Sequence, residues 1–401
     1  MHITTRPKAV VLGLTSKMPL AGITLLTMQY VVGLRRLGFD VYYVEEHGKM
    51  PWLLMSPGRT DGAAVAAAFI DRLMRRFGLE EGRWAFISPH DRDQCYGVPD
   101  TALNTVFREA ALVLNLHGGT IPRPEHAAGD RLVYVGTDPV EVEVSLDNGD
   151  QGIVDYLDPH CAFFTWGENY GNPDCLVPTS DRFAFIPSRQ PIVMDLWEPC
   201  QGTPSDAFTT IGNWRQPYRA ITFRGEVYHW SKHLEFTKFL ELPQRCESAF
   251  ELALINAEEE DHRMLQSHGW RTRDAGSFSL DLDAYRHYIA RSRGEFTVAK
   301  DQNVRLRSGW FSDRSASYLA CGRPVVTQET GFSNILPTGD GLFAFSTVDE
   351  IVEAIAAIDS DYARHSNAAR RIAREWFDYR VVLGAMLDHL DIRTADVEAS
   401  A

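Results

Sequence analysis

The stretch that decides the fold reads RSGWFSDRSASYLACGRPVVTQETGF and runs from Arg307 to Phe332. A Gly-Trp loop leads into a helix of small residues, predicted over 313–320, with Ser312 as its N-cap. Gly322 ends this helix, and the β-branched strand RPVVT follows at once. A helix that returns so directly to a short apolar strand is typical of a parallel sheet covered by helices.

The same alternation runs through both halves of the chain. In the first half, the apolar runs AVVLGL and ALVLNL at 9–14 and 111–116 predict buried strands. In the second half, AFTTIGNW and EFTVAK at 207–214 and 295–300 predict strands in the same setting. Strands that are apolar throughout and alternate with helices predict an α/β protein with two doubly wound, Rossmann-like sheets.

The boundary between the halves is marked by RFAFIPSRQPIVMDLWEPCQGTPSD, a segment containing four prolines. We therefore predict a first domain over 1–197 and a second over 198–376. A chain of 401 residues exceeds the size at which a single core stops growing, which agrees with two domains. The helical tract over 361–390 is predicted to break near 377–379, so that 377–401 forms a separate C-terminal helix and tail.

Composition limits the class of protein and of partner. Hydrophobic residues make up 44% and charged residues 23%, as in ordinary globular proteins. The net charge of −14 argues against nucleic acid or an anionic membrane as partner. We find neither a run long enough for a membrane segment nor a secretory signal. The six cysteines contain no C-x-x-C pair, which favours reduced thiols in the cytoplasm and no zinc site.

Functional residues are expected in loops that follow strands, because ligands of doubly wound sheets bind beyond the carboxyl ends of the strands. The loop before the 313–320 helix is the first candidate. Ser312 and the free amides of the first turn are suited to a phosphate, and Arg314 supplies a charged donor. An ordinary capped helix, with Asp313 favoured by the helix dipole, is the alternative interpretation.

The segment SASYLACGRPVVTQETG resembles the donor-binding segment of GT-B glycosyltransferases, especially the retaining branch, and the match is closest from Ser317 to Val326. The resemblance implies a GT-B fold, with two Rossmann-like domains facing a cleft and a C-terminal helix that crosses back. It also implies that the second domain binds a nucleotide sugar, such as a UDP-sugar, while the acceptor enters from the first. The two glutamates of the branch fall on Gly309 and Ser317 here, so the nucleotide and the stereochemistry stay open.

Further donor-binding candidates follow strands of the second domain. Gly212 permits close backbone approach, and Arg224 and Lys232 are placed to neutralise a diphosphate. Lys300 stands at the carboxyl end of the strand EFTVAK. Surface cations beside an aromatic-rich turn are the alternative for Arg224 and Lys232, and a solvated lysine is the alternative for Lys300.

In the first domain, His117 directly follows a buried strand and is the candidate general base toward an acceptor. Asp138 and His47 compete for that role, and a structural histidine is the alternative. Lys17, Gly22 and His47 are the acceptor-side candidates.

The function expected is transfer of a sugar from a nucleotide sugar to a hydroxyl or amine of a small-molecule or glycan acceptor. No metal and no cofactor other than the donor are expected. A nucleotide-sugar epimerase, a sugar phosphorylase and a binding protein that has lost catalysis remain alternatives, and the oligomeric state is open.

Overall fold

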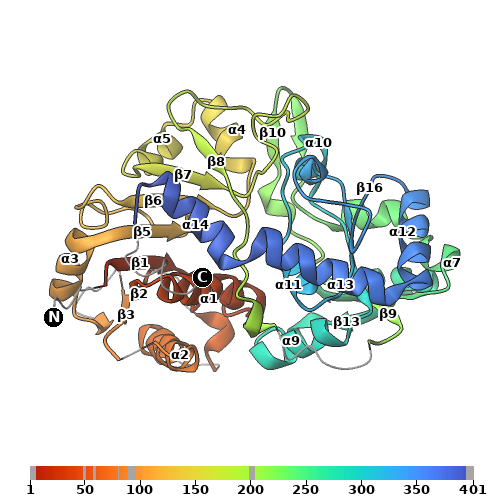
Figure 1. Ribbon diagram of the computed structural model, residues 1–401, viewed down its shortest axis with the longest axis horizontal. Helices are drawn as coiled ribbons and strands as arrows, with labels where there is room; N and C mark the ends of the chain where they lie inside the picture. The colour runs from red at the N-terminus through yellow and green to blue at the C-terminus, as the bar shows by residue number, and fades with distance from the viewer. Residues whose placement is uncertain are drawn as a thin grey trace.

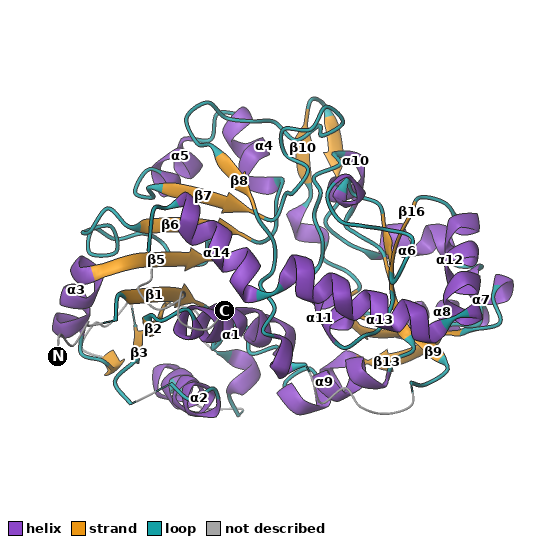
Figure 2. Cartoon of the chain, in the orientation of Figure 1, coloured by secondary structure: helices purple, strands orange, loops and turns teal. Residues whose placement is uncertain are grey.

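The computed structural model describes residues 6–47, 51–56, 60–79, 81–88, 95–197 and 204–393. Two sheets lie side by side, the first built from the first half of the chain and the second from the second half (Figure 1). Helices cover both, as the purple and orange elements of Figure 2 show. The α/β class and the two Rossmann-like sheets predicted from the sequence are confirmed.

The first sheet has the strand order β4-β3-β2-β1-β5-β6-β7-β8, and all pairs are parallel except β3 with β4. Its strands are β1 Lys8–Gly13, β2 Asp40–Glu46, β3 Trp84–Ile87, β4 Cys95–Gly97, β5 Ala110–Leu116, β6 Leu132–Gly136, β7 Ala162–Thr165 and β8 Phe185–Pro187. Its helices are α1 Ala21–Arg36, α2 Gly62–Arg76, α3 Asp100–Glu109, α4 Glu141–Asp147 and α5 Gln151–Leu157.

The second sheet has the order β13-β12-β9-β14-β15-β16 and is parallel throughout. Its strands are β9 Ala207–Asn213, β12 Ala249–Ile255, β13 Arg271–Asp274, β14 Gly294–Thr297, β15 Val325–Gln328 and β16 Leu342–Phe345. Its main helices are α8 Glu259–Ser267, α9 Leu282–Arg291, α10 Asp301–Arg305, α11 Asp313–Ala320 and α12 Val348–Ser360. Short helices α6 His233–Phe236 and α7 Leu242–Arg245 and a hairpin, β10 Ile221–Phe223 with β11 Glu226–Tyr228, complete it.

In each sheet the order in which successive strands are added reverses at one point. This point lies between β1 and β5 in the first sheet and between β9 and β14 in the second. The crevice at such a switch point is where doubly wound sheets bind their ligands. Continuous apolar strands fit this arrangement because both faces are covered, and β1, for example, is buried from Ala9 to Gly13.

The C-terminal tract is helical, with a break where the sequence predicts one. α13 covers Tyr362–Ile372, a π-helical turn covers 373–377, and α14 covers Tyr379–His389. Between them Asp378 is extended, and its carboxylate accepts a hydrogen bond of 2.9 Å from the backbone N of Arg380. α14 returns to α1 so closely that a Cβ on Gly33 would lie 2.8 Å from Leu383. Packing on α1 therefore carries the chain back to the first domain.

The boundary predicted at 197/198 and the predicted tail over 394–401 adjoin or lie outside the described residues. Within those residues, none of the helices is long and apolar enough to cross a bilayer. Cys161, Cys175 and Cys246 are free thiols. Cys321, however, is disulfide-bonded, which corrects the expectation of reduced thiols throughout.

Candidate functional site

The Gly-Trp loop before α11 joins the two domains. Gly167 and Trp310 form an isolated antiparallel bridge, and the Trp310 Nε1 donates to the Thr137 carbonyl at 3.2 Å. Gly309 has a φ of +80°, and a Cβ there would lie 2.1 Å from the backbone N of Asn169. Glycine is required because only it permits this backbone and this contact. The loop therefore holds the carboxyl edges of the two sheets against each other.

The start of α11 is built as the sequence predicts, but its arginine is occupied. Ser312 Oγ accepts from the backbone N of Arg314 at 3.2 Å, which confirms the predicted N-cap. The Arg314 guanidinium donates to Glu295 Oε1 at 2.6 Å, to the Ile211 carbonyl at 2.5 Å and to Thr297 Oγ1 at 3.0 Å. Direct phosphate binding by Arg314 stays a prediction, and the geometry favours a cation that anchors α11 to β9 and β14.

Lys232 is a buried lysine for which the described residues supply no carboxylate partner. Its side chain is buried, with 8% of the residue exposed, and it makes no ion pair within the ranges that the structure covers. Its Nζ lies 5.3 Å from the centre of the Trp310 ring. Burial lowers the pKa of Lys232 well below its usual value, and the positive charges of Arg314 and Lys300 lower it further. An anion in the crevice would relieve both effects.

Lys300 lies beside it and spans the two domains. Its Nζ lies 2.5 Å from Asp138 Oδ1 of the first domain and 3.3 Å from the centre of the Trp230 ring. Burial lowers the pKa of Lys300, partly opposed by Asp138. Burial acts to raise the pKa of Asp138, but Lys300 outweighs it and holds that pKa below its usual value. Burial also raises the pKa of the neighbouring Asp313.

His117 is held between two threonines at the end of β5. Its Nδ1 lies 3.0 Å from Thr137 Oγ1, and its Nε2 lies 3.5 Å from Thr27 Oγ1. Thr27 Oγ1 donates to the Ile23 carbonyl, which leaves it an acceptor for an Nε2 hydrogen. Burial lowers the pKa of His117 to about 4, with Asp138 opposing, so the imidazole is neutral at physiological pH. A neutral imidazole is the form that can accept a proton.

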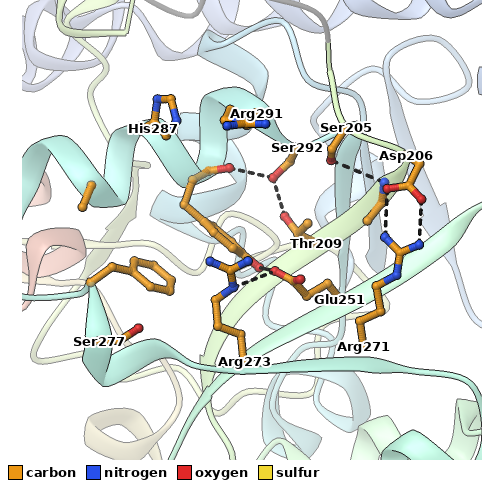
Figure 3. Close-up of a pocket in the computed structure, with 14 residues that line it drawn as sticks. Ser205, Asp206, Thr209, Glu251, Arg271, Arg273, Ser277, His287, Arg291 and Ser292 are labelled. Atoms are coloured by element: carbon orange, nitrogen blue, oxygen red, sulfur yellow. Dashed lines mark hydrogen bonds and ion pairs between the residues drawn. The ribbon is translucent and has the colours of Figure 1, made fainter.

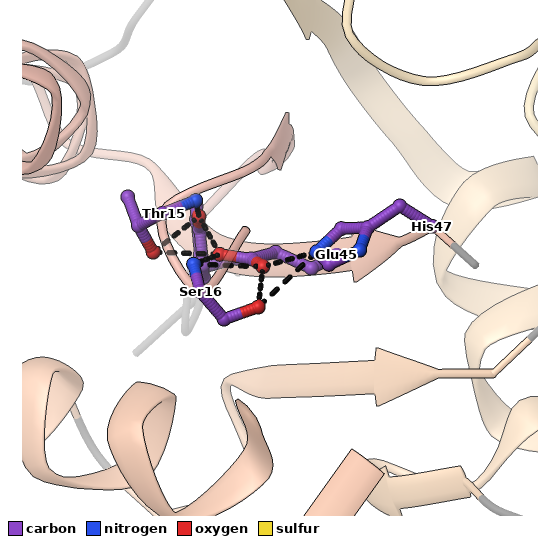
Figure 4. Close-up of polar contacts among 5 residues, drawn as sticks. Thr15, Ser16, Glu45 and His47 are labelled. Carbon is purple, nitrogen blue, oxygen red and sulfur yellow. Dashed lines mark hydrogen bonds and ion pairs between the residues drawn. The ribbon is translucent and has the colours of Figure 1, made fainter. Parts of the chain in front are cut away.

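The loop after β1 is fixed by Glu45, a fully buried carboxylate that the sequence analysis did not select (Figure 4). Glu45 accepts hydrogen bonds from Thr15 Oγ1 at 2.6 Å and from the backbone N of Ser16 at 3.0 Å. His47 Nε2 lies 2.9 Å from Glu45 Oε2 and 3.1 Å from Ser16 Oγ. His47 therefore supports this loop, which makes it a poorer candidate for the base than His117.

The other acceptor-side candidates lie on the same side of the crevice. Lys17 is half-buried in the loop after β1. Gly22 opens α1, and a Cβ there would lie 3.1 Å from the hydroxyl of Tyr285 in α9. Gly22 thus lets the first helix approach the second domain closely.

Three donor-side candidates differ in how the structure places them. Gly212 is the second-last residue of β9 and lies beside open space, with no atom within 4 Å of a Cβ built there. Ser317 Oγ donates to the Asp313 carbonyl inside α11 at 2.9 Å, so it is occupied within its own helix. Arg224 is not brought to Lys232. It lies at the exposed turn of the β10–β11 hairpin, with its guanidinium 4.7 Å from the centre of the Phe223 ring.

Sequence reasoning also missed the aromatic walls of the site. Trp230 and Trp310 are buried beside Lys232 and Lys300. The guanidinium of Arg219 also lies 3.6 Å from the centre of the Trp230 ring. Tryptophan carries no signal in a single sequence that separates such a wall from ordinary core packing.

A cavity of about 630 Å³ lies elsewhere, at the amino-terminal side of the second sheet between α9 and strands β9, β12 and β13 (Figure 3). Its arginines are paired, Arg271 with Asp206 at 2.7 Å and Arg273 with Glu251 at 3.3 Å. It lies away from the carboxyl edge where the candidate residues gather. In the described part of the chain, no three His, Cys, Asp or Glu side chains are grouped to hold a metal ion, and metal independence stays a prediction.

A protein-family model described as "Glycosyl transferase-like" matches residues 244–388. That region contains β12, β14, α11 and the crossing helix α14. No curated protein sequence matches the chain.

Solved structures resemble the chain over nearly its whole length. One is Alr3699/HepE from Anabaena in complex with UDP-glucose, at 14% identity and a TM-score of 0.54, with 96% of this chain and 99% of that chain covered. Another is an alpha-glucosyltransferase in complex with UDP, at 9% identity and a TM-score of 0.55, covering 96% and 100%. The same enzyme with UDP and a 13-mer DNA matches at 8% identity and a TM-score of 0.55, covering 96% and 100%. At these identities the likeness concerns the fold.

Proposed function

We propose that this chain, a divergent glycosyltransferase of the GT-B fold, transfers a sugar from a UDP-sugar to a hydroxyl or amine of a small-molecule or glycan acceptor. Support for the reaction class comes from the family match over 244–388 and from the fold. Support for UDP comes from the three similar structures described above, which contain UDP or UDP-glucose.

The observation that carries the proposal is Lys232, a buried cation without a carboxylate partner at the switch point of the second sheet. When the glycosidic bond to the nucleotide breaks, the bonding electrons leave with the diphosphate, whose negative charge increases. Lys232, Lys300 and the first-turn amides of α11 other than that of Arg314, which donates to Ser312, would stabilise that charge. The open space beside Gly212 leaves room for the donor at this edge.

His117 is the proposed general base. It is neutral and faces the crevice from the first domain, and Thr137 and Thr27 hold its ring. With Nε2 donating to Thr27, the acceptor hydroxyl would replace Thr137 Oγ1 at Nδ1, and Nδ1 would take its proton as the new glycosidic bond forms. Asp138 is bound to Lys300 and is the weaker candidate for this role.

Nucleotide binding and turnover test the proposal in two steps. UDP, GDP and dTDP are compared by thermal shift. A ligand present at 100 times its Kd stabilises the native state by about 2.7 kcal/mol, so UDP should raise Tm clearly. UDP-sugars are then incubated with and without acceptors. Slow release of UDP and free sugar without acceptor indicates a transferase, whereas an epimerised nucleotide sugar indicates an epimerase. The absence of any nucleotide effect on Tm would overturn the proposal.

The expected partners and location are also proposed. A net charge of −14 supports a glycan or small molecule over DNA as the acceptor, although one similar enzyme is bound to DNA. The free thiols of Cys161, Cys175 and Cys246 support a cytoplasmic location, and the disulfide at Cys321 is the observation against it. A metal-independent reaction that uses no cofactor besides the donor is proposed because two lysines already face the expected diphosphate.

A further inference from the structure

A groove of about 520 Å³ lies between the crossing helix and the first sheet, outside the crevice described above. Its apolar walls come from β7, β8 and one face of α14. The residues that form them are Phe164, Ile186, Val381, Val382 and Met386. His389 of α14 closes one side, its ring centre 5.8 Å from that of Phe164. The volume is that of a site for a small molecule.

One end of this groove is polar and is formed by Glu168 and Arg189. The two side chains form an ion pair, and 3% of the Glu168 side chain is exposed. The guanidinium of Arg189 lies 5.3 Å from the centre of the Trp376 ring. Only one carboxylate oxygen of Glu168 is bonded. The other, Oε2, is buried and has no hydrogen-bond partner.

An unbonded buried carboxylate oxygen is costly, because it has lost its water without gaining a donor. Burial accordingly raises the pKa of Glu168 to about 7, even though Arg189 opposes the shift. A ligand that donates a hydrogen bond at this position would satisfy the oxygen.

We propose that this groove binds a neutral small molecule with an apolar body and a hydroxyl group, the body lying on α14 and β8 and the hydroxyl donating to Glu168 Oε2. The charges of the two polar residues select a neutral ligand. Because Arg189 pairs with Glu168, the polar end of the groove carries no net charge that would compensate an ion for the water it loses on binding. An anion would meet Glu168 and the exposed Glu375 at the rim.

The site is separate from the donor crevice, although the two share a loop. Gly167, next to Glu168, pairs with Trp310, whose ring faces Lys232. The proposal does not depend on glycosyl transfer, because binding is measured without any nucleotide sugar.

The test compares two probes and a matched pair of variants by isothermal titration calorimetry on the full chain. 2-Naphthol has an apolar ring system and a hydroxyl, whereas 2-methoxynaphthalene lacks the hydrogen to donate. Val381→Lys places a charge on the groove wall. Val227→Lys is the control, because Val381 is 48% exposed and Val227, on β11, is 49% exposed.

We expect 2-naphthol to bind the wild-type protein and Val227→Lys equally, to bind Val381→Lys at least tenfold more weakly, and to bind at least tenfold more tightly than 2-methoxynaphthalene. Glu168→Leu should remove the difference between the probes. Three results would each overturn the proposal: no binding of 2-naphthol, equal binding by the two lysine variants, or equal binding of the two probes. If Glu168→Leu does not fold, the probe pair and the Val381 and Val227 variants still decide the question.

Discussion

Replacing Lys232 with methionine should move two measured quantities in opposite directions. Methionine keeps the length of the side chain and removes the charge. If Lys232 binds the diphosphate, the variant loses a charge-assisted hydrogen bond worth about 1.5–3 kcal/mol. At 1.36 kcal/mol per factor of ten, UDP affinity should fall about 10- to 150-fold. The affinity is measured by calorimetric titration of UDP.

Stability should rise in the same variant, because a charge is buried there without a partner. Replacing buried ionic groups by apolar ones is often neutral or stabilising. A gain on the order of 1 kcal/mol would raise Tm by about 1 °C if the 401 residues unfold together, because the unfolding entropy grows with chain length. A lysine that served only to hold the fold would instead lower Tm when removed. Arg224→Met is the control, because that arginine is exposed on a hairpin turn and should change neither quantity.

The buried Lys232 should also make the stability of the protein depend on pH. Since the pKa of Lys232 is lowered in the native state from an ordinary 10.5, the unfolded state binds more protons in the window between the two values. Stability therefore rises with pH across that window, and the methionine variant should lose this contribution. UDP binding by the wild type should take up protons in that window, seen as a buffer-dependent binding enthalpy. Unchanged UDP affinity, or a lower Tm in Lys232→Met, would refute the reasoning.

Three other changes test neighbouring features. His117→Gln should slow transfer about 10²- to 10⁴-fold without changing UDP affinity. Because burial lowers the pKa of His117 to about 4, the transfer rate of the wild type should fall on the acid side near pH 4. A fall near pH 6.5 would argue against His117 as the base. Asp138→Asn and Lys300→Gln, combined in a double-mutant cycle of unfolding free energies, should show a coupling of about 0.5–3 kcal/mol, whereas additive effects would mean that the ion pair between the domains is unimportant. Gly309→Ala should lower the unfolding free energy by at least about 1 kcal/mol, because the new Cβ would lie 2.1 Å from the backbone N of Asn169. Gly149→Ala is the control. Gly149 is exposed, has a φ of +79° and has no atom within 4 Å of a Cβ, so this variant measures the cost of the backbone conformation alone.

Much of the fold follows from local patterns. The helix predicted over 313–320 is α11, Asp313–Ala320, because a capping serine, a run of small residues and a glycine stop all agree. The break predicted near 377–379 occurs at Asp378, which leaves the helix and caps the next one. The GT-B fold suggested by SASYLACGRPVVTQETG is confirmed, and the match of residues 244–388 to a glycosyl transferase-like family model agrees with the activity that the segment suggests.

The site was harder to predict, because its partners come from distant parts of the chain. Arg224 was grouped with Lys232 on sequence proximity, but Arg224 and Gly225 both have positive φ and form a tight hairpin turn that points the arginine away. Arg-Gly between ITF and EVY was the available signal for that turn. The contacts of Arg314 with Glu295 and of Glu45 with Ser16 depend on sheet register, and a single sequence does not reveal it.

The return of α14 to α1 has a consequence for biosynthesis. Leu383, Met386 and Leu387 of α14 pack in the same core as Ala9 and Val11 of β1, which is translated long before α14. The first domain therefore cannot complete its core until α14 has been translated, whereas the second domain is continuous in sequence and can fold earlier. A nascent chain stalled before Tyr379 would present an uncovered α1, which makes this interval the one in which a chaperone has most to protect.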